Sequence, residues 1–157
     1  MNDNSIGIEL VNKGHQFGYT SFKKKQISSL IKLCKKLIKK YKINKKNILG
    51  HSDIAPLRKI DPGEKFPWKK LKKSKLGIWY KPLKFKSQKI NDKKINELFF
   101  KNLFKIGYRY FDLKRRSRKD VFLTRAFQRR FAPNKVTGII DQKTYIISHF
   151  LANRHKN

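Results

Sequence analysis

Residues 50–68 read GHSDIAPLRKIDPGEKFPW, and the rest of the chain is best interpreted around this stretch. It places a His, a Lys and an Asp between prolines and glycines. Pro56 and Pro62 each lack a backbone N–H and bias the preceding residue toward extended conformations, so a long helix is excluded here. The stretch is therefore predicted to be a shaped loop whose polar side chains can converge.

Three side chains of this loop suit chemistry at a metal ion. His51 and Asp61 are good ligands for a borderline metal such as zinc, and Lys59 lies where it can stabilise negative charge. Spacing alone leaves an alternative open, because a His and an Asp ten residues apart are common and a loop His is usually only solvated.

The wording G-H-S-D-I-A-P-x-R-K-x-D-P-G-x-x-F-P-W resembles the C-terminal signature of zinc-dependent N-acetylmuramoyl-L-alanine amidases of the type-2 amidase family, relatives of the peptidoglycan recognition proteins. The resemblance implies an α/β domain over residues 1–80, with a mixed sheet flanked by helices. It implies a zinc ion, with His51 and Asp61 as two of its three protein ligands. The implied reaction is hydrolysis of the amide between N-acetylmuramic acid and L-alanine.

A carboxylate interrupts the apolar pattern near the N-terminus. Residues 5–11 read SIGIELV, which predicts a short buried strand containing Glu9. Glu9 must pair, face the surface or serve a function, because burying it unpaired is costly. SIGIEL also resembles the strand that carries the catalytic Glu of the same amidases. The resemblance implies that Glu9 transfers the proton of water to the leaving amine, while Lys59 stabilises the oxyanion.

One zinc ligand of the family has no counterpart. It is a His on a strand well upstream of SIGIEL, and only eight residues precede Glu9. His15 lies downstream and does not match it, so we expect His15 at the rim of a loop over residues 12–19, near substrate. We expect an amidase domain whose N-terminal part is missing, and, if the chain is the whole protein, weak zinc binding and little hydrolysis.

The segment between these two motifs has helical periodicity. Residues 22–41 repeat apolar side chains at spacings of three and four, with Lys between them, which predicts an amphipathic helix packed on the sheet. A membrane-surface helix is the alternative. Residues 47–49 are expected to form a second short strand that leads to His51.

The second half is predicted to be a small all-α three-helix domain over residues 92–157, after a linker at 81–91. Its helices are expected to follow Asp92, Ser117 and Asp141. RAFQRRFAP at 125–133, with the later VTGIID and Thr144, resembles peptidoglycan-binding-like domains.

Composition constrains the partners less sharply. The formal net charge of +31 favours an anionic partner, yet dispersed lysines arise equally well from compositional drift. The dispersion argues against specific nucleic-acid binding. The single cysteine, Cys34, excludes an internal disulfide, and no apolar run is long enough to span a bilayer.

The function expected from the sequence is zinc-dependent cleavage of peptidoglycan or muropeptides by a monomer. The alternatives are a non-enzymatic peptidoglycan-binding remnant or a basic nucleic-acid-binding protein. The wall-binding resemblance favours the cell envelope or periplasm. The cytoplasm stays open as an alternative, because no signal peptide precedes the folded part.

Overall fold

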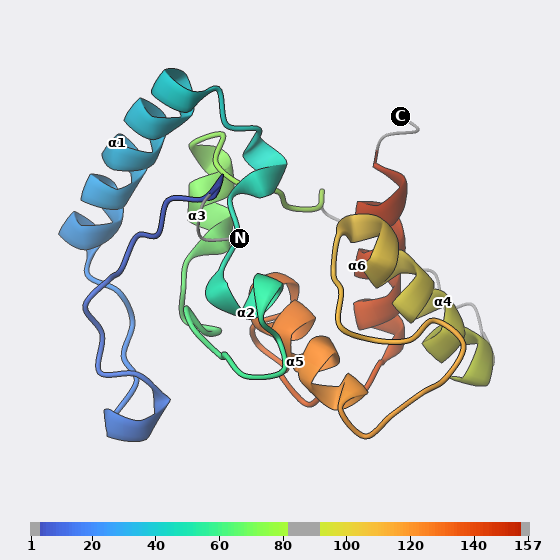
Figure 1. Cartoon of the computed structure of the whole chain (residues 1–157). Helices are drawn as coiled ribbons and strands as arrows, with labels where there is room; N and C mark the ends of the chain where they lie inside the picture. The colour runs from blue at the N-terminus through green and yellow to red at the C-terminus, as the bar shows by residue number, and fades with distance from the viewer. Residues whose placement is uncertain (1–3, 82–91, 155–157) are drawn as a thin grey trace.

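The computed structural model of this chain describes residues 4–81 and 92–154. Within these ranges the regular structure is helical (Figure 1). The elements are η2 (His15–Phe17), α1 (Lys24–Tyr41), η3 (Lys45–Asn47), α2 (His51–Ile54), α3 (Trp68–Lys73), α4 (Asp92–Ile106), α5 (Asp120–Phe131) and α6 (Gln142–Asn153).

The expected mixed sheet is wrong, because no strand occurs among the described residues. Residues 5–11 are extended but form no ladder, and Ile6, Ile8 and Val11 are 48%, 36% and 92% exposed. Of the expected second strand at 47–49, Asn47 is the last residue of the turn η3, and residues 48 and 49 form no strand. A strand needs a neighbour for its backbone hydrogen bonds and a core for its apolar side chains. Alternation of apolar residues in the sequence indicates side chains suited to a core, but it does not indicate a neighbouring strand for the backbone hydrogen bonds.

Helix α1 begins and ends close to the expected positions, but it does not pack on a sheet. Its inner face buries Ile27, Leu30 and Cys34. This face contacts the residues that follow the 50–61 segment, and the resulting core also contains Phe66, Trp68, Leu71 and Leu76. The first core is therefore made by one helix, the short helix α3 and loops.

The second core lies between α4, α5 and α6. Its centre is aromatic and almost fully buried: Phe99 and Phe127 have no exposed surface and meet edge to face, with ring centroids 5.4 Å apart. On α5 the buried positions include Leu123, Ala126, Phe127 and Phe131, whereas Phe122 is 43% exposed.

Gln128 shows what the motif that resembles peptidoglycan-binding-like domains does in the fold. Its side-chain carbonyl accepts from the backbone N–H of Gly138 at 2.8 Å, and its amide donates to the Ile139 carbonyl at 2.8 Å and to Thr144. Asp141 caps α6 by accepting from the Thr144 N–H at 2.8 Å. These motif residues hold the α5–α6 connection in place, which is a structural task.

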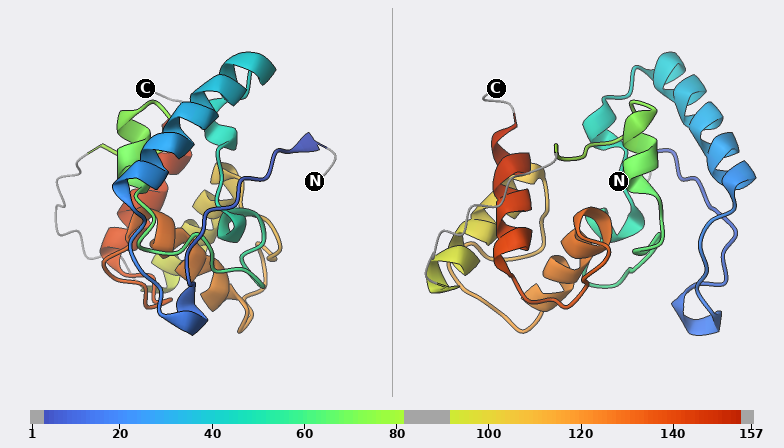
Figure 2. Two further views of the ribbon diagram at one scale, coloured as in Figure 1. Left: turned by 90° about the vertical axis from the view of Figure 1, so that its left-hand side faces the viewer. Right: turned by 180° about the vertical axis from the view of Figure 1, so that it is seen from behind.

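The two cores adjoin each other. Trp79 packs against both, and α2 contacts α5 at the centre of the molecule (Figure 1). The right-hand view in Figure 2 shows the same arrangement from behind, with α1 on one side and the pair α4–α6 on the other. Most of the predicted linker, residues 82–91, lies outside the described residues. The boundaries predicted for the two domains stay predictions.

Candidate active site in the 50–68 loop

The 50–68 loop brings His51 and Asp61 together. His51 Nδ1 lies 3.1 Å from Asp61 Oδ2, and the two side chains are 38% and 59% exposed. The backbone N–H of Ser52 donates to the Asp61 carbonyl at 2.9 Å, so the two segments are joined beside the side-chain pair. An imidazole and a carboxylate, both open to solvent, thus meet across ten positions of sequence.

Two glycines allow the loop to close this tightly. A Cβ at Gly50 would lie 2.7 Å from Pro62 Cδ and 3.2 Å from the Trp68 ring. Gly63 has φ +79°, and a Cβ there would lie 2.6 Å from the Tyr19 hydroxyl. A larger residue at either position would push the two ends of the loop apart or strain its backbone.

A buried carboxylate anchors the His51 end of the loop. Asp53 accepts from the Gly50 N–H at 2.7 Å, from the Tyr108 hydroxyl at 2.7 Å and from the Arg130 guanidinium. The Asp53 and Arg130 side chains are only 5% and 3% exposed. Burial, together with the neighbouring Asp53 charge, raises the pKa of Tyr108 well above its ordinary value, so this hydroxyl stays a donor.

The Asp61 end is held closer to the surface. Tyr19 donates its hydroxyl to the Pro62 carbonyl at 2.6 Å and accepts from the Lys65 N–H at 3.0 Å. Burial raises the pKa of Tyr19 to about 12. His15 stacks on Tyr19 with ring centroids 4.2 Å apart and lies 3.1 Å from Glu64. His15 therefore borders the loop, and its ring nitrogen Nε2 is engaged by a carboxylate.

Glu64 also lies near a positive charge on α5. Arg129 Nε lies 3.9 Å from Glu64 Oε2. Burial by itself raises the pKa of Glu64, but hydrogen bonds from its own backbone N–H and from His15 outweigh it, and the pKa of this carboxyl is lowered overall. Burial lowers the pKa of Arg129.

Among the described residues, no hydrogen bond or ion pair joins Glu9 or Lys59 to the His51–Asp61 pair. Glu9 is exposed on the extended segment 5–11, and its carboxylate makes no hydrogen bond or ion pair within the described ranges. Lys59 is half-buried, and its backbone N–H donates to the Ala55 carbonyl at 3.0 Å. The catalytic roles predicted for both side chains stay predictions.

The donors present suit part of a zinc site. Imidazole nitrogen and carboxylate oxygen are both zinc ligands, and His51 and Asp61 offer one of each, close together and accessible. In residues 4–81 and 92–154, no third His, Cys, Asp or Glu completes a metal-binding group.

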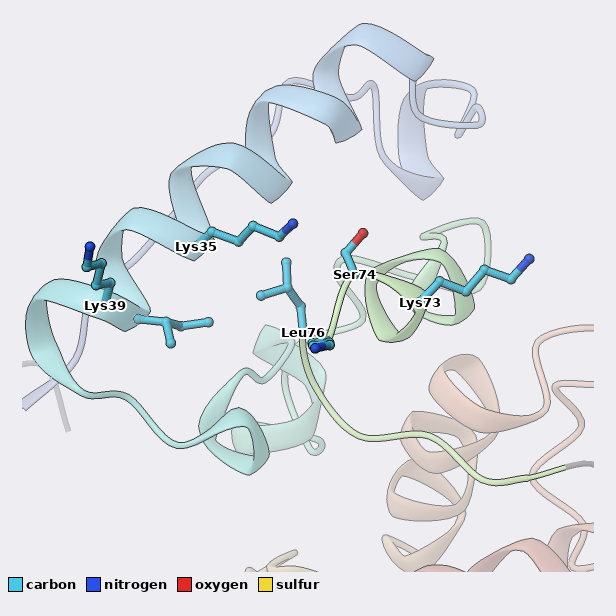
Figure 3. A pocket seen from close by; sticks show the side chains of 7 residues that line it. Lys35, Lys39, Lys73, Ser74 and Leu76 are labelled. Carbon is cyan, nitrogen blue, oxygen red and sulfur yellow. The ribbon is translucent and has the colours of Figure 1, made fainter.

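One hollow in the surface lies away from the loop. It has about 400 Å³ and is lined by Lys35, Ile38, Lys39, Lys73, Ser74, Lys75 and Leu76, so it contains neither a carboxylate nor an imidazole (Figure 3). In Figure 3 the amino groups of Lys39 and Lys73 point away from each other and not into one centre. The chemistry of the 50–68 loop lies outside this hollow.

Sequence reasoning missed Asp53, Tyr108 and Arg130. Asp53 lies inside the quoted motif, but its partners follow 55 and 77 residues later. The local indication was an acid followed by the apolar Ile54 and Ala55, since an acid must find a partner when it is buried. No spacing rule connects positions so far apart.

No helix among the described residues is both long and apolar enough to cross a membrane.

Comparison with known proteins finds one family in the N-terminal part of the chain. The family Amidase_2, N-acetylmuramoyl-L-alanine amidase, matches residues 1–64. The chain is 34% identical over 169 residues to N-acetylmuramoyl-L-alanine amidase AmiD of Escherichia coli K12, and this match covers 99% of the chain and 59% of AmiD. It is 46% identical over 70 residues to the 1,6-anhydro-N-acetylmuramyl-L-alanine amidase AmpD of Haemophilus influenzae, covering 44% of the chain and 36% of AmpD.

Solved structures agree with this placement. E. coli AmiD in complex with anhydro-N-acetylmuramic acid-L-Ala-D-gamma-Glu-L-Lys superposes with a TM-score of 0.74 at 29% identity, covering 88% of the chain and 55% of AmiD. AmpDh3 of Pseudomonas aeruginosa gives 0.71 at 28% identity, covering 90% of the chain and 57% of AmpDh3. The chain thus spans about half to three fifths of the length of relatives that match along most of it. Together with the motif in the 50–68 loop, these matches show that the N-terminal part of the chain, residues 1–64, belongs to the type-2 N-acetylmuramoyl-L-alanine amidase family.

Proposed function

We propose that this chain hydrolyses the amide between N-acetylmuramic acid and L-alanine, in peptidoglycan or its fragments, with zinc held by His51 and Asp61. The observation that carries the proposal is the 3.1 Å approach of His51 Nδ1 to Asp61 Oδ2 inside the family motif. The names of AmiD and AmpD, both muramoyl-L-alanine amidases, support the reaction class.

Zinc would supply a Lewis acid here and bring the pKa of a bound water toward about 7. His51 and Asp61 hold their donor atoms at the surface, where an ion and a substrate can both reach them. A catalytic zinc site normally has three protein ligands. In the proposal, His51 and Asp61 are two of these three ligands.

Two further side chains have roles in the proposal. Glu9 accepts the proton of the attacking water and then donates it to the leaving amine of L-alanine, which is general base and general acid catalysis by a carboxylate. Lys59 places its ammonium against the oxyanion that develops on the amide carbonyl. Both roles require that substrate binding bring Glu9 and Lys59 to the His51–Asp61 pair.

Muropeptide fragments are the substrates that the proposal favours. The structures of AmiD and AmpDh3 that match this chain include complexes with an anhydromuramic tripeptide and an anhydromuramic pentapeptide. Such peptides carry carboxylates, and a chain of net charge +31 attracts anions from solution. Action as a monomer and a location in the cell envelope are further parts of the proposal.

The test is release of peptide from anhydro-N-acetylmuramyl-L-Ala-D-gamma-Glu-L-Lys in the presence of Zn²⁺, followed by mass spectrometry. We expect His51→Ala and Asp61→Ala to abolish the release. His149→Ala is the matched control, because it removes an exposed imidazole on α6 and should leave the rate unchanged. Retention of the wild type on insoluble peptidoglycan without any peptide release would replace the proposal with non-enzymatic wall binding.

A further inference from the structure

A single carboxylate joins three separate parts of the chain beside His51. Asp53 accepts from the loop backbone at Gly50, from Tyr108 just after α4 and from Arg130 on α5. Both members of the Asp53–Arg130 pair are more than nine-tenths buried. A buried charge pair of this kind tolerates loss of one member poorly, because the other charge is left without compensation.

Arg130 reaches both sides of His51. One guanidinium nitrogen donates to Asp53, and the other donates to the Ile48 carbonyl at 3.0 Å. The guanidinium plane also lies over the Trp68 ring, 4.0 Å from its centroid. One arginine thus contacts the residues before His51, the residues after it and the end of the 50–68 loop. A lysine at this position could not make these contacts together, because its single ammonium lacks the several planar N–H donors of a guanidinium.

Helix α2 depends on these contacts for its position. It has only four residues, His51–Ile54, and so short a helix is not stable on its own. His51 and Asp53 belong to it, and consequently whatever fixes Asp53 also fixes the backbone that carries the His51 imidazole. The Ser52 N–H, between them, donates to the Asp61 carbonyl at 2.9 Å and reports on the alignment of the two segments.

We propose that Arg130, through Asp53 and with Tyr108, is a positioning residue that holds His51 in register with Asp61, so that the C-terminal helices form part of the candidate metal site. The link between Arg130 and catalysis rests on the proposed function. The alignment of the two ends of the loop by Arg130 does not depend on it.

Amide hydrogen exchange of Ser52 in the full chain tests the inference without metal or substrate. We compare Arg130→Met with Gln128→Met, because Gln128 is equally buried on α5 and, within the described part of the chain, its side-chain hydrogen bonds go to residues 138–144. In Arg130→Met, exchange at Ser52 should accelerate about tenfold more than in Gln128→Met. Exchange at Leu103, in the second core, should change similarly in both variants.

Titration with Zn²⁺ alone provides the second readout. Arg130→Met should weaken zinc binding, whereas Gln128→Met should leave it at the wild-type value. Equal acceleration of Ser52 exchange in both variants, in proportion to global stability, would overturn the inference. If wild type binds no zinc but Ser52 responds as expected, the positioning role stands and the proposed function fails.

Tyr108→Phe serves where Arg130→Met does not fold. It keeps the ring in the core and removes one donor to Asp53. Exchange at Ser52 should accelerate in the same direction by a smaller factor. An unchanged Ser52 rate in Tyr108→Phe would count against the role of this hydroxyl in holding the loop.

Discussion

The two ends of the 50–68 loop are held by neighbouring arginines of α5 at very different depths. At the His51 end, Arg130 and Asp53 form an ion pair with almost no exposed surface. At the Asp61 end, Arg129 and Glu64 are 3.9 Å apart, with Glu64 29% exposed. Solvent screens the second pair and not the first. We therefore expect the register of the loop to depend on its buried end.

Asp53→Asn tests the difference between the two ion pairs with the largest expected effect, because it leaves the Arg130 charge buried without a counter-charge. We expect the free energy of unfolding to fall by about 3–5 kcal/mol. The control is Asp61→Asn, an equal chemical change at a carboxylate that is 59% exposed, with an expected loss below about 1 kcal/mol. Urea denaturation of both variants provides the measurement, and equal losses would contradict the comparison.

An intermediate effect is expected at Tyr19, whose hydroxyl bonds to two backbone groups of the exposed end. Tyr19→Phe should cost about 1–2 kcal/mol at neutral pH. Because burial raises the pKa of Tyr19 to about 12, its stabilising contribution is fully present below the unfolded pKa of about 10 and is lost as pH rises toward 12.

Unfolding free energies of wild type and Tyr19→Phe should therefore converge between about pH 10 and pH 12. The same series with Tyr110→Phe, at a tyrosine that is 66% exposed, is the control and should run parallel to wild type. A constant gap between wild type and Tyr19→Phe over this range would show that Tyr19 is not buried against the loop.

The smallest effect is expected at Glu64. Glu64→Gln should lower the free energy of unfolding by less than about 1 kcal/mol. The Glu64 carboxylate is partly exposed, and Arg129 Nε lies 3.9 Å from it. The pKa of Glu64 is lowered, so its contribution is present above the unfolded pKa of about 4.3 and disappears as pH falls through the lower folded pKa. Thermal melts from pH 7 to pH 3 should show the two proteins becoming equal in acid.

Several features were predictable because the chain encodes them locally. The 22–41 helix follows from apolar spacing, and α6 starts where Asp141 can cap it. The convergence of His51 and Asp61 was predicted from a proline-rich loop. The sheet was predicted wrongly from an equally local pattern, the alternation in residues 5–11, since a strand exists only with a hydrogen-bonding partner.

The sequence by itself determined helices α1, α4, α5 and α6, the Asp141 cap of α6, the loop and the family motif that it carries. Only the tertiary structure decided what holds the loop. Asp53 gains its meaning from Tyr108 and Arg130, which are 55 and 77 positions away. Periodicity and capping act within a few residues, whereas a buried carboxylate is stabilised by whichever donors the folded chain brings to it, wherever they lie in the sequence.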